Sequence, residues 1–148
     1  MAITECFGTV VGQVAEVRIQ EGRPVVRKVT AVVDCGIPIS PDQIAAQMEG
    51  SIGFGLTAAL YGAVTLKDGF VQETNFDNYP ILRMNEMPTV ETHIMRSANR
   101  PTGMGEPGVP PIAPAVANAM LILTGSPTTS LPILSGNALG NSVVSVRS

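Results

Sequence analysis

The chain has 148 residues, of which 45% are hydrophobic and 14% are charged, and its mean hydropathy is +0.27. This length fits one domain of roughly 150 residues, and the composition excludes intrinsic disorder, which requires low hydrophobicity and high charge. Nine Lys and Arg against twelve Asp and Glu give a net charge of −3, and aromatic residues make up only 4%. We therefore expect no nucleic-acid partner, because neither a basic surface nor a set of stacking aromatics is present.

The chain has two cysteines, Cys6 and Cys35, and one histidine, His93. Without a CxxC pair or an HExxH motif, these residues offer no ligand set for zinc or for an iron–sulfur cluster. Both cysteines lie in apolar, strand-like runs, so we expect buried, inert thiols. We expect His93 on a strand surface or in a hydrogen bond. Met1–Thr4 lack a basic n-region, so no targeting signal is expected and the compartment stays open between cytoplasm and periplasm.

The first predicted elements are strands. Residues 7–19 alternate polar and apolar side chains towards their end, which is typical of a half-buried strand. Residues 24–34 form a second, β-branched run, and Glu21-Gly22 between the two runs predicts a hairpin. Residues 89–95 alternate in the same way, and we expect these three strands to be antiparallel. Residues 66–71 predict one further, short hairpin.

Two helices are predicted, over residues 41–61 and 112–124. The first begins with residues in capping-box register at N-cap, N1 and N3: Ser40, Pro41 and Gln43. Three glycines interrupt it, at a cost of about 1 kcal/mol each relative to Ala, and indicate close approach of another backbone or of a ligand: Gly50, Gly53 and Gly55. Gly125 ends the second helix as its C′ residue. The predicted fold class is therefore α+β, with antiparallel strands and two main helices.

The loop of residues 103–111 holds one carboxylate, Glu106, among three glycines and three prolines. Glycines permit close backbone approach and prolines fix the path of the chain, so the direction of the carboxylate is strongly imposed. In these apolar surroundings we expect Glu106 to be desolvated, which suits a general acid or base. The N-terminus of the following helix has the opposite effect on the carboxyl group, because it stabilises the ionised form. An acid in a rigid turn before a helix, with no catalytic role, accounts for the same pattern.

Five stretches carry a family resemblance: FGTVVGQVAEV (7–17), AVVDCG (31–36), PDQIAAQMEGSIGFGLTAALYG (41–62), NFDNYPILRMNEMP (75–88) and GMGEPGVPPIAPAVANA (103–119). In this order they resemble the C-terminal part of the molybdopterin-binding subunit of the xanthine oxidase and aldehyde oxidase family. The resemblance is closest to the isoquinoline 1-oxidoreductase beta subunits and related aldehyde dehydrogenases. Because the matches keep the family order over most of the chain, they are far more specific than any single motif.

The resemblance implies a molybdenum–pterin cofactor and an oxidoreductase that hydroxylates N-heterocycles or oxidises aldehydes, with water as the oxygen source. Glu106 falls on the family's catalytic general base, and no residue of this chain is implied as a metal ligand. The cofactor-binding positions that the resemblance implies are Gln47, Glu49, Gly50, Gly103 and Gly105. Residues 1–134 are then a partial molybdopterin-binding domain, and residues 135–148 are a tail that we expect to be loosely ordered.

The family subunit extends far upstream of the point that matches Met1. We therefore expect a fragment, a split subunit or an excised domain that is inactive alone. Its expected partners are the remainder of the molybdenum subunit, an iron–sulfur subunit and an aldehyde or N-heterocycle substrate. The apolar composition also predicts self-association. The alternative is a non-catalytic α+β interaction or assembly module that keeps the fold. A self-contained hydrolase is disfavoured, because Glu106 has no second acid, nucleophile or metal beside it in the sequence.

Overall fold

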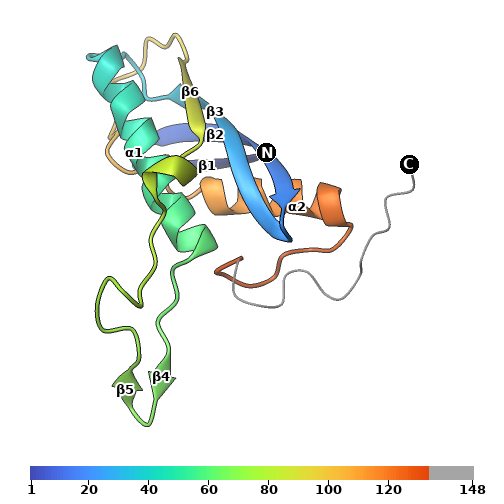
Figure 1. The fold of residues 1–148 in the computed structure, drawn as a ribbon. Helices are drawn as coiled ribbons and strands as arrows, with labels where there is room; N and C mark the ends of the chain where they lie inside the picture. Colours follow the sequence, from blue (N-terminus) through green and yellow to red (C-terminus); the bar gives the residue numbers. More distant parts are fainter. Residues whose placement is uncertain (134–148) are drawn as a thin grey trace, which may run out of the picture.

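The computed structural model describes residues 1–133, and within them a four-stranded main sheet and two helices form the body of an α+β fold (Figure 1). The main sheet has the order β1-β2-β3-β6 and consists of β1 (Ala2–Cys6), β2 (Thr9–Gln20), β3 (Arg23–Asp34) and β6 (Thr89–Ile94). The helices are α1 (Pro41–Leu60) and α2 (Ile112–Thr124). The predicted fold class is confirmed. The tail expected over residues 135–148 lies outside the described residues.

The antiparallel part of the sheet is set by two-residue turns. Phe7 and Gly8 join β1 to β2 with φ of 55° and 76°, and Glu21 and Gly22 join β2 to β3 with φ of 52° and 74°. Positive φ at both central residues gives a turn whose twist matches that of the flanking strands. The prediction of a strand from residue 7 was wrong in this respect: the chain turns at Phe7 and Gly8, and the strand begins at Thr9. β1 was not predicted, because its five residues form a strand through their ladder with β2 rather than through a pattern of their own.

The strand β6 runs parallel to β3, and the prediction of an antiparallel arrangement was wrong for this strand. Between β3 and β6 the chain passes through α1 and residues 61–88, so it returns to the same end of the sheet before it enters β6. Parallel neighbours need a crossover of this kind, whereas antiparallel neighbours can be joined by a short turn. Alternation of side chains identifies the buried face of a strand but not its direction.

Both helices pack on one face of the sheet. The helix α2 lies across β1 and β2, while α1 contacts β6 and α2. Gly55 lies close to the start of α2, because a Cβ at this position would stand 2.5 Å from Ile112 Cγ2 and 3.2 Å from the Val109 carbonyl oxygen. The close approach predicted from the glycines of the first helix is therefore confirmed at Gly55. The inward side chains form one core, which includes Val11, Val29, Val33, Met48, Ile52, Leu56, Ile112 and Val116.

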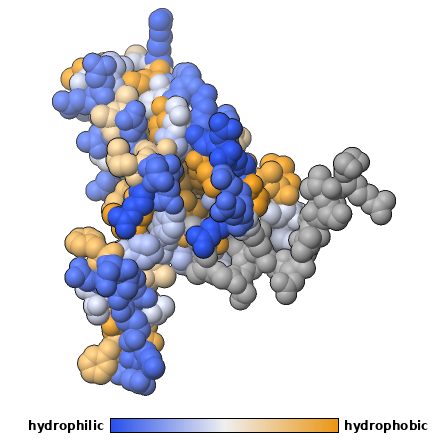
Figure 2. All heavy atoms as spheres, viewed as in Figure 1, coloured by the Kyte–Doolittle hydropathy of each residue, from blue (hydrophilic) through white to orange (hydrophobic). Residues whose placement is uncertain are grey.

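The opposite face of the sheet is left uncovered by residues 1–133. Neighbouring positions on β1, β2 and β3 place four exposed apolar side chains together there, and we call this group the outer-face patch: Ile3, Val10, Val14 and Val32. Apolar residues are also visible at the surface of the molecule in Figure 2. A sheet usually buries its apolar surface against another layer, so this face is suited to contact with another polypeptide.

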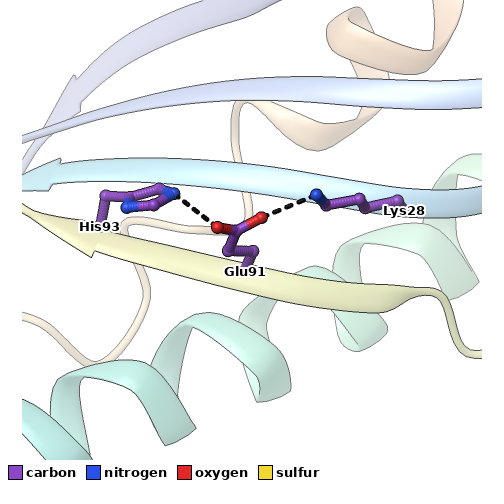
Figure 3. A network of polar contacts seen from close by, with 3 residues as sticks. All are labelled: Lys28, Glu91 and His93. Atoms are coloured by element: carbon purple, nitrogen blue, oxygen red, sulfur yellow. Dashed lines mark ion pairs between the residues drawn. The ribbon is translucent and has the colours of Figure 1, made fainter.

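Beside the outer-face patch, Glu91 on β6 lies between two basic side chains (Figure 3). Its carboxylate is 2.7 Å from Lys28 Nζ on β3 and 3.1 Å from His93 Nε2. The lysine lowers the pKa of Glu91, with a smaller contribution from His93. A carboxyl group with a lowered pKa contributes stability that is lost as the pH falls through its folded-state pKa, and the exposure of these groups keeps that contribution small. As expected, His93 lies at the surface of its strand.

Residues 62–88 form an arm whose tip projects from the body of the molecule (Figure 1). The tip is the hairpin β4 (Leu66–Lys67) and β5 (Phe70–Val71), as predicted, and a 3-10 turn, η1 (Met84–Glu86), lies near the return to the body. There the Tyr61 hydroxyl at the end of α1 donates a hydrogen bond to Glu86. Burial, together with this carboxylate, raises the pKa of Tyr61 to about 12. The hydroxyl therefore stays protonated at neutral pH and remains a donor.

The ends of the helices agree only in part with the sequence patterns. Pro41 is the first residue of α1, but the Ser40 side chain makes no capping hydrogen bond, so the predicted capping box was wrong. The Ser40 carbonyl accepts the Ile44 N–H at 3.0 Å, and Gln43 lines a pocket instead. Gly125 ends α2 in the left-handed conformation, as predicted. Within residues 1–133, no helix is long and apolar enough to cross a bilayer.

Candidate functional site

A pocket of about 500 Å³ lies between α1, the β1–β2 turn and residues 105–110, and we call it the main pocket. A second pocket of about 290 Å³, the side pocket, shares two lining residues with it, Gln47 and Gly105. The two pockets are therefore neighbours, with Gln47 and Gly105 at their boundary. The main pocket is lined by Cys6, Phe7, Gln47, Gly50, Ser51, Phe54, Gly105, Glu106, Val109 and Pro110.

Helical geometry determines which candidate residues of α1 lie on the same face of the helix. Residues three or four positions apart share a helix face, whereas residues two apart do not. Gln47 and Gly50 are three positions apart and both line the main pocket, together with Phe54, which is 72% exposed. Glu49 is two positions from Gln47, is exposed and lines neither pocket. The structure therefore brings Gln47 and Gly50 together and leaves Glu49 apart from them.

The segment of residues 103–108, which we call the glutamate loop, is held against β2 and α1. Three side chains donate hydrogen bonds to three of its carbonyl oxygens: Thr9 Oγ1 to Gly103 at 2.7 Å, Ser51 Oγ to Gly105 at 3.2 Å and Gln13 Nε2 to Gly108 at 2.8 Å. Gly108 also packs closely on α1, because a Cβ there would stand 2.7 Å from Ser51 Cβ. The loop is thus anchored on both sides of Glu106. Gly103 takes part through its carbonyl and lines neither pocket.

Glu106 is the one carboxylate among the described residues that line the two pockets. Glu106 is exposed within the described residues 1–133. The expectation that its carboxylate is desolvated was therefore wrong. The neighbouring prolines and glycines constrain the loop but leave the Glu106 side chain exposed. Within the same described range, no three His, Cys, Asp or Glu residues gather into a group that could hold a metal ion. The main pocket therefore offers a hydrogen-bonding amide and a carboxylate that can accept a proton.

The two thiols differ in their surroundings. Cys35 is buried at the end of β3 beside the side pocket, and this burial raises its pKa. Cys6 is only half-buried and lines the main pocket. The expectation of a buried thiol is confirmed for Cys35 and was wrong for Cys6, because Cys6 lies at the end of the edge strand, where no further strand covers it.

Several residues of the site were not predicted from the sequence. Gln13 could have been identified, because the alternation of its strand places it on the same inward face as Val11 and Ala15. Ser51 lies within a predicted helix, and nothing in its local sequence marks a contact with a distant loop. Phe7 enters the pocket only because the chain turns there, and a strand was expected at that position.

Comparison with known proteins identifies the family. A family described as molybdopterin cofactor-binding domain matches residues 3–88. The beta subunit of isoquinoline 1-oxidoreductase from Brevundimonas diminuta is 38% identical over 108 residues, which cover 73% of this chain and 14% of that protein. The membrane-bound aldehyde dehydrogenase of Gluconacetobacter polyoxogenes is 30% identical over 128 residues, which cover 85% of this chain and 17% of that protein. The chain thus spans about a sixth or less of the length of these relatives.

Solved structures show the same fold. Quinoline 2-oxidoreductase from Pseudomonas putida 86 superposes with a TM-score of 0.78 at 24% identity, over 84% of this chain and 17% of that chain. The aldehyde oxidoreductase from Desulfovibrio desulfuricans superposes with a TM-score of 0.70 at 20% identity, over 84% and 14% of the two chains. The expected relationship to molybdopterin-binding subunits of the xanthine oxidase family is confirmed by the family match and by the sequence relatives, and the solved structures confirm the fold. The chain belongs to the molybdopterin cofactor-binding domain family.

Proposed function

We propose that this chain is the C-terminal portion of the molybdenum-binding subunit of a molybdenum hydroxylase and that it is inactive without the rest of that subunit. In this proposal the main pocket forms one wall of the cofactor site and Glu106 is the general base. The observation that carries it is the convergence of two distant segments on one pocket: Gln47 and Gly50 from α1, and Gly105 and Glu106 from the glutamate loop.

The pocket residues fit a flat, polar cofactor such as a pterin. Nothing lies within 4 Å of the place where a Cβ would stand at Gly50 or at Gly105, so the wall at these two positions is bare backbone that a ring system can approach. The Gln47 amide can both donate and accept hydrogen bonds, which matches the mixed polar edge of a pterin. We therefore assign the cofactor contacts of this chain to Gln47, Gly50 and Gly105. Glu49 and Gly103 line neither pocket, and we assign no cofactor contact to them.

When bound, the molybdenum–pterin cofactor supplies the redox centre that accepts the two electrons removed from the substrate. The residues of this chain supply the proton transfer. Glu106, held by the anchored loop, takes a proton from the water-derived oxygen that attacks the substrate carbon. The fitting substrates are N-heterocycles with an electron-poor carbon and aldehydes. Because Glu106 is exposed in this chain, the rest of the subunit would provide the cover that excludes water from the site.

The proposed partners are the remainder of the molybdenum subunit and an iron–sulfur subunit that takes up the electrons. Several relatives carry the word subunit in their names, among them the beta subunit of isoquinoline 1-oxidoreductase and the large subunit of nicotine 6-hydroxylase from Paenarthrobacter nicotinovorans. The chain spans only a small part of such proteins, so most of the site must come from other segments.

Co-expression with the missing portion tests the proposal through cofactor content. The assembled protein should contain molybdenum and pterin, measured by metal analysis and by the fluorescence of the oxidised pterin. Gln47→Ala should weaken cofactor retention by roughly 2- to 12-fold, which corresponds to the loss of one hydrogen bond of about 0.5–1.5 kcal/mol. Gln72→Ala, which alters an exposed glutamine on the arm, is the control and should retain the cofactor. An assembled protein without molybdenum would favour the non-catalytic assembly module instead.

The isolated chain is expected to self-associate through the outer-face patch. Ile3 is 69% exposed within this patch, and exposed apolar patches of several hundred Å² usually mark interfaces. Val14→Lys places a charge in the patch and should shift the sedimentation profile towards the monomer. Gln72→Lys, which adds the same charge at an exposed position on the arm, is the control. A wild-type chain that sediments as a monomer at high concentration would contradict this prediction.

A further inference from the structure

We propose that Gln13 is a positioning residue for Glu106: a buried amide that reaches from the sheet to the glutamate loop and fixes the direction of the carboxylate. This inference rests on the proposed function, because it concerns the aim of the general base. It does not place Gln13 in contact with substrate or cofactor, since Gln13 lines neither pocket. Its role would be exerted through the backbone at Gly108.

Gln13 is completely buried in the inward face of β2. Its Nε2 donates to the Gly108 carbonyl at 2.8 Å, and its Oε1 has no hydrogen-bond partner within the described residues. A buried polar atom without a partner is costly, and the neighbouring inward positions on the strand are the apolar Val11 and Ala15. Packing alone would be better served by an apolar side chain at position 13. The contact that accounts for a glutamine here is the hydrogen bond to the loop.

The hydrogen bonds to the loop bracket Glu106. Thr9, four residues before Gln13 on the same face of β2, holds the Gly103 carbonyl, three residues before the glutamate. Gln13 holds the Gly108 carbonyl, two residues after it. Of these two bonds, the one from Gln13 is fully buried, whereas the one from Thr9 is only partly buried. A buried hydrogen bond is shielded from competition with water, so Gln13 provides the firmer of the two anchors.

The loop has little freedom to adjust if this anchor is lost. Gly108 already lies so close to α1 that a Cβ would stand 2.7 Å from Ser51 Cβ and 3.0 Å from Met48 Cε. The loop therefore cannot move further towards the helix. Without the donor from Gln13, the buried Gly108 carbonyl has to move outwards to find water, and Glu106 moves with it. A shift of about 1 Å in a catalytic group can lower the rate by roughly 10²-fold.

The test compares two substitutions in the assembled enzyme at full cofactor loading. Gln13→Met keeps the length of the side chain but removes the donor, and it should lower kcat by roughly 10- to 100-fold at nearly constant KM. Amide hydrogen exchange in the peptide that contains residues 103–109 should become faster, which is a readout independent of turnover. Gln20→Met, at the exposed end of the same strand, is the matched control and should change neither quantity.

Gln13→Glu supplies a signature that a purely structural role would not produce. A protonated carboxyl group at this position can donate to the Gly108 carbonyl, whereas an ionised one cannot. The kcat of Gln13→Glu, divided by that of the wild type at each pH, should therefore rise as the pH falls, while the same ratio for Gln13→Met stays flat. If the methionine variant fails to assemble, the pH dependence of the Gln13→Glu ratio decides the matter by itself, because both of its terms come from the glutamate variant and the wild type.

Two results would overturn the inference. One is unchanged kcat and unchanged loop exchange in Gln13→Met. The other is a loss of activity that follows only cofactor loading or thermal stability, with no pH-dependent recovery in Gln13→Glu. The proposed function fails by a different measurement, namely wild-type turnover in Glu106→Gln. Loop exchange in Gln13→Met is measured without turnover, so the two failures can be told apart.

Discussion

Replacing Glu106 by glutamine is expected to lower the turnover of the assembled enzyme by roughly 10²- to 10⁴-fold, the usual contribution of a general base. Glutamine keeps the shape and the hydrogen-bonding reach of the side chain but cannot accept a proton. Molybdenum and pterin content should remain unchanged, because Gln47, Gly50 and Gly105 form the cofactor wall in our proposal. Steady-state kinetics at matched cofactor loading measure the effect.

The same substitution should leave the fold intact. Glu106 is exposed, and substitutions at exposed positions usually change the free energy of unfolding by no more than about 0.5 kcal/mol. Urea unfolding of the variant should therefore coincide with that of the wild type. Glu16→Gln, which removes an exposed carboxylate on β2, is the control for the loss of one negative charge and should keep wild-type turnover. Wild-type turnover in Glu106→Gln itself would show that the base assignment is wrong and that the glutamate loop has only a structural role.

The elements of the fold could be predicted where local chemistry determines them. Pro41 and Gly125 mark helix ends through their own backbone preferences, and Asp68 and Gly69 form the turn of the short hairpin. β1 and the direction of β6 are determined instead by pairing with distant strands. No local pattern encodes such pairing, so these two features could not be read from the sequence. The same limit explains why the capping box failed: the Gln43 side chain lines the side pocket, which forms only after folding.

The candidate site likewise has some features that the local sequence predicts and others that depend on the fold. The positions of Gln47 and Gly50 on one helix face follow from their spacing, and the isolation of Glu49 follows from the same geometry. The exposure of Glu106 could not be predicted from its apolar neighbours, because burial depends on what covers a loop rather than on its composition. The anchoring of that loop joins residues that are almost a hundred positions apart, as in the bond from Gln13 to Gly108. Only the folded structure shows that the loop is anchored while Glu106 is exposed within residues 1–133.

Replacing Gly36 by alanine is expected to have the second large effect, a loss of stability. The segment that leads into the glutamate loop lies directly against this glycine. Its φ is 73°, and a Cβ would stand 2.2 Å from the Arg100 carbonyl oxygen. Two backbone hydrogen bonds flank this contact, from Ile37 N–H to Asn99 and from Thr102 N–H to Cys35, both at 3.0 Å. Gly36→Ala cannot keep both bonds, since the new methyl group meets rigid backbone. We expect a loss of roughly 2–5 kcal/mol in the free energy of unfolding, combining left-handed strain with overpacking.

Gly22 is the matched control for this prediction. Its φ of 74° is nearly the same, but nothing lies within 4 Å of the place where its Cβ would stand. Gly22→Ala should therefore show only the conformational cost of about 1–2 kcal/mol, and the difference between the two variants in urea unfolding measures the backbone contact alone. Equal losses in the free energy of unfolding would show that residues 99–102 can move away from the new methyl group without loss of stability. If the losses differ as expected, the Gly36 variant should also show faster hydrogen exchange at Thr102, because the displacement of this segment opens the side pocket wall that Thr102 shares with Cys35.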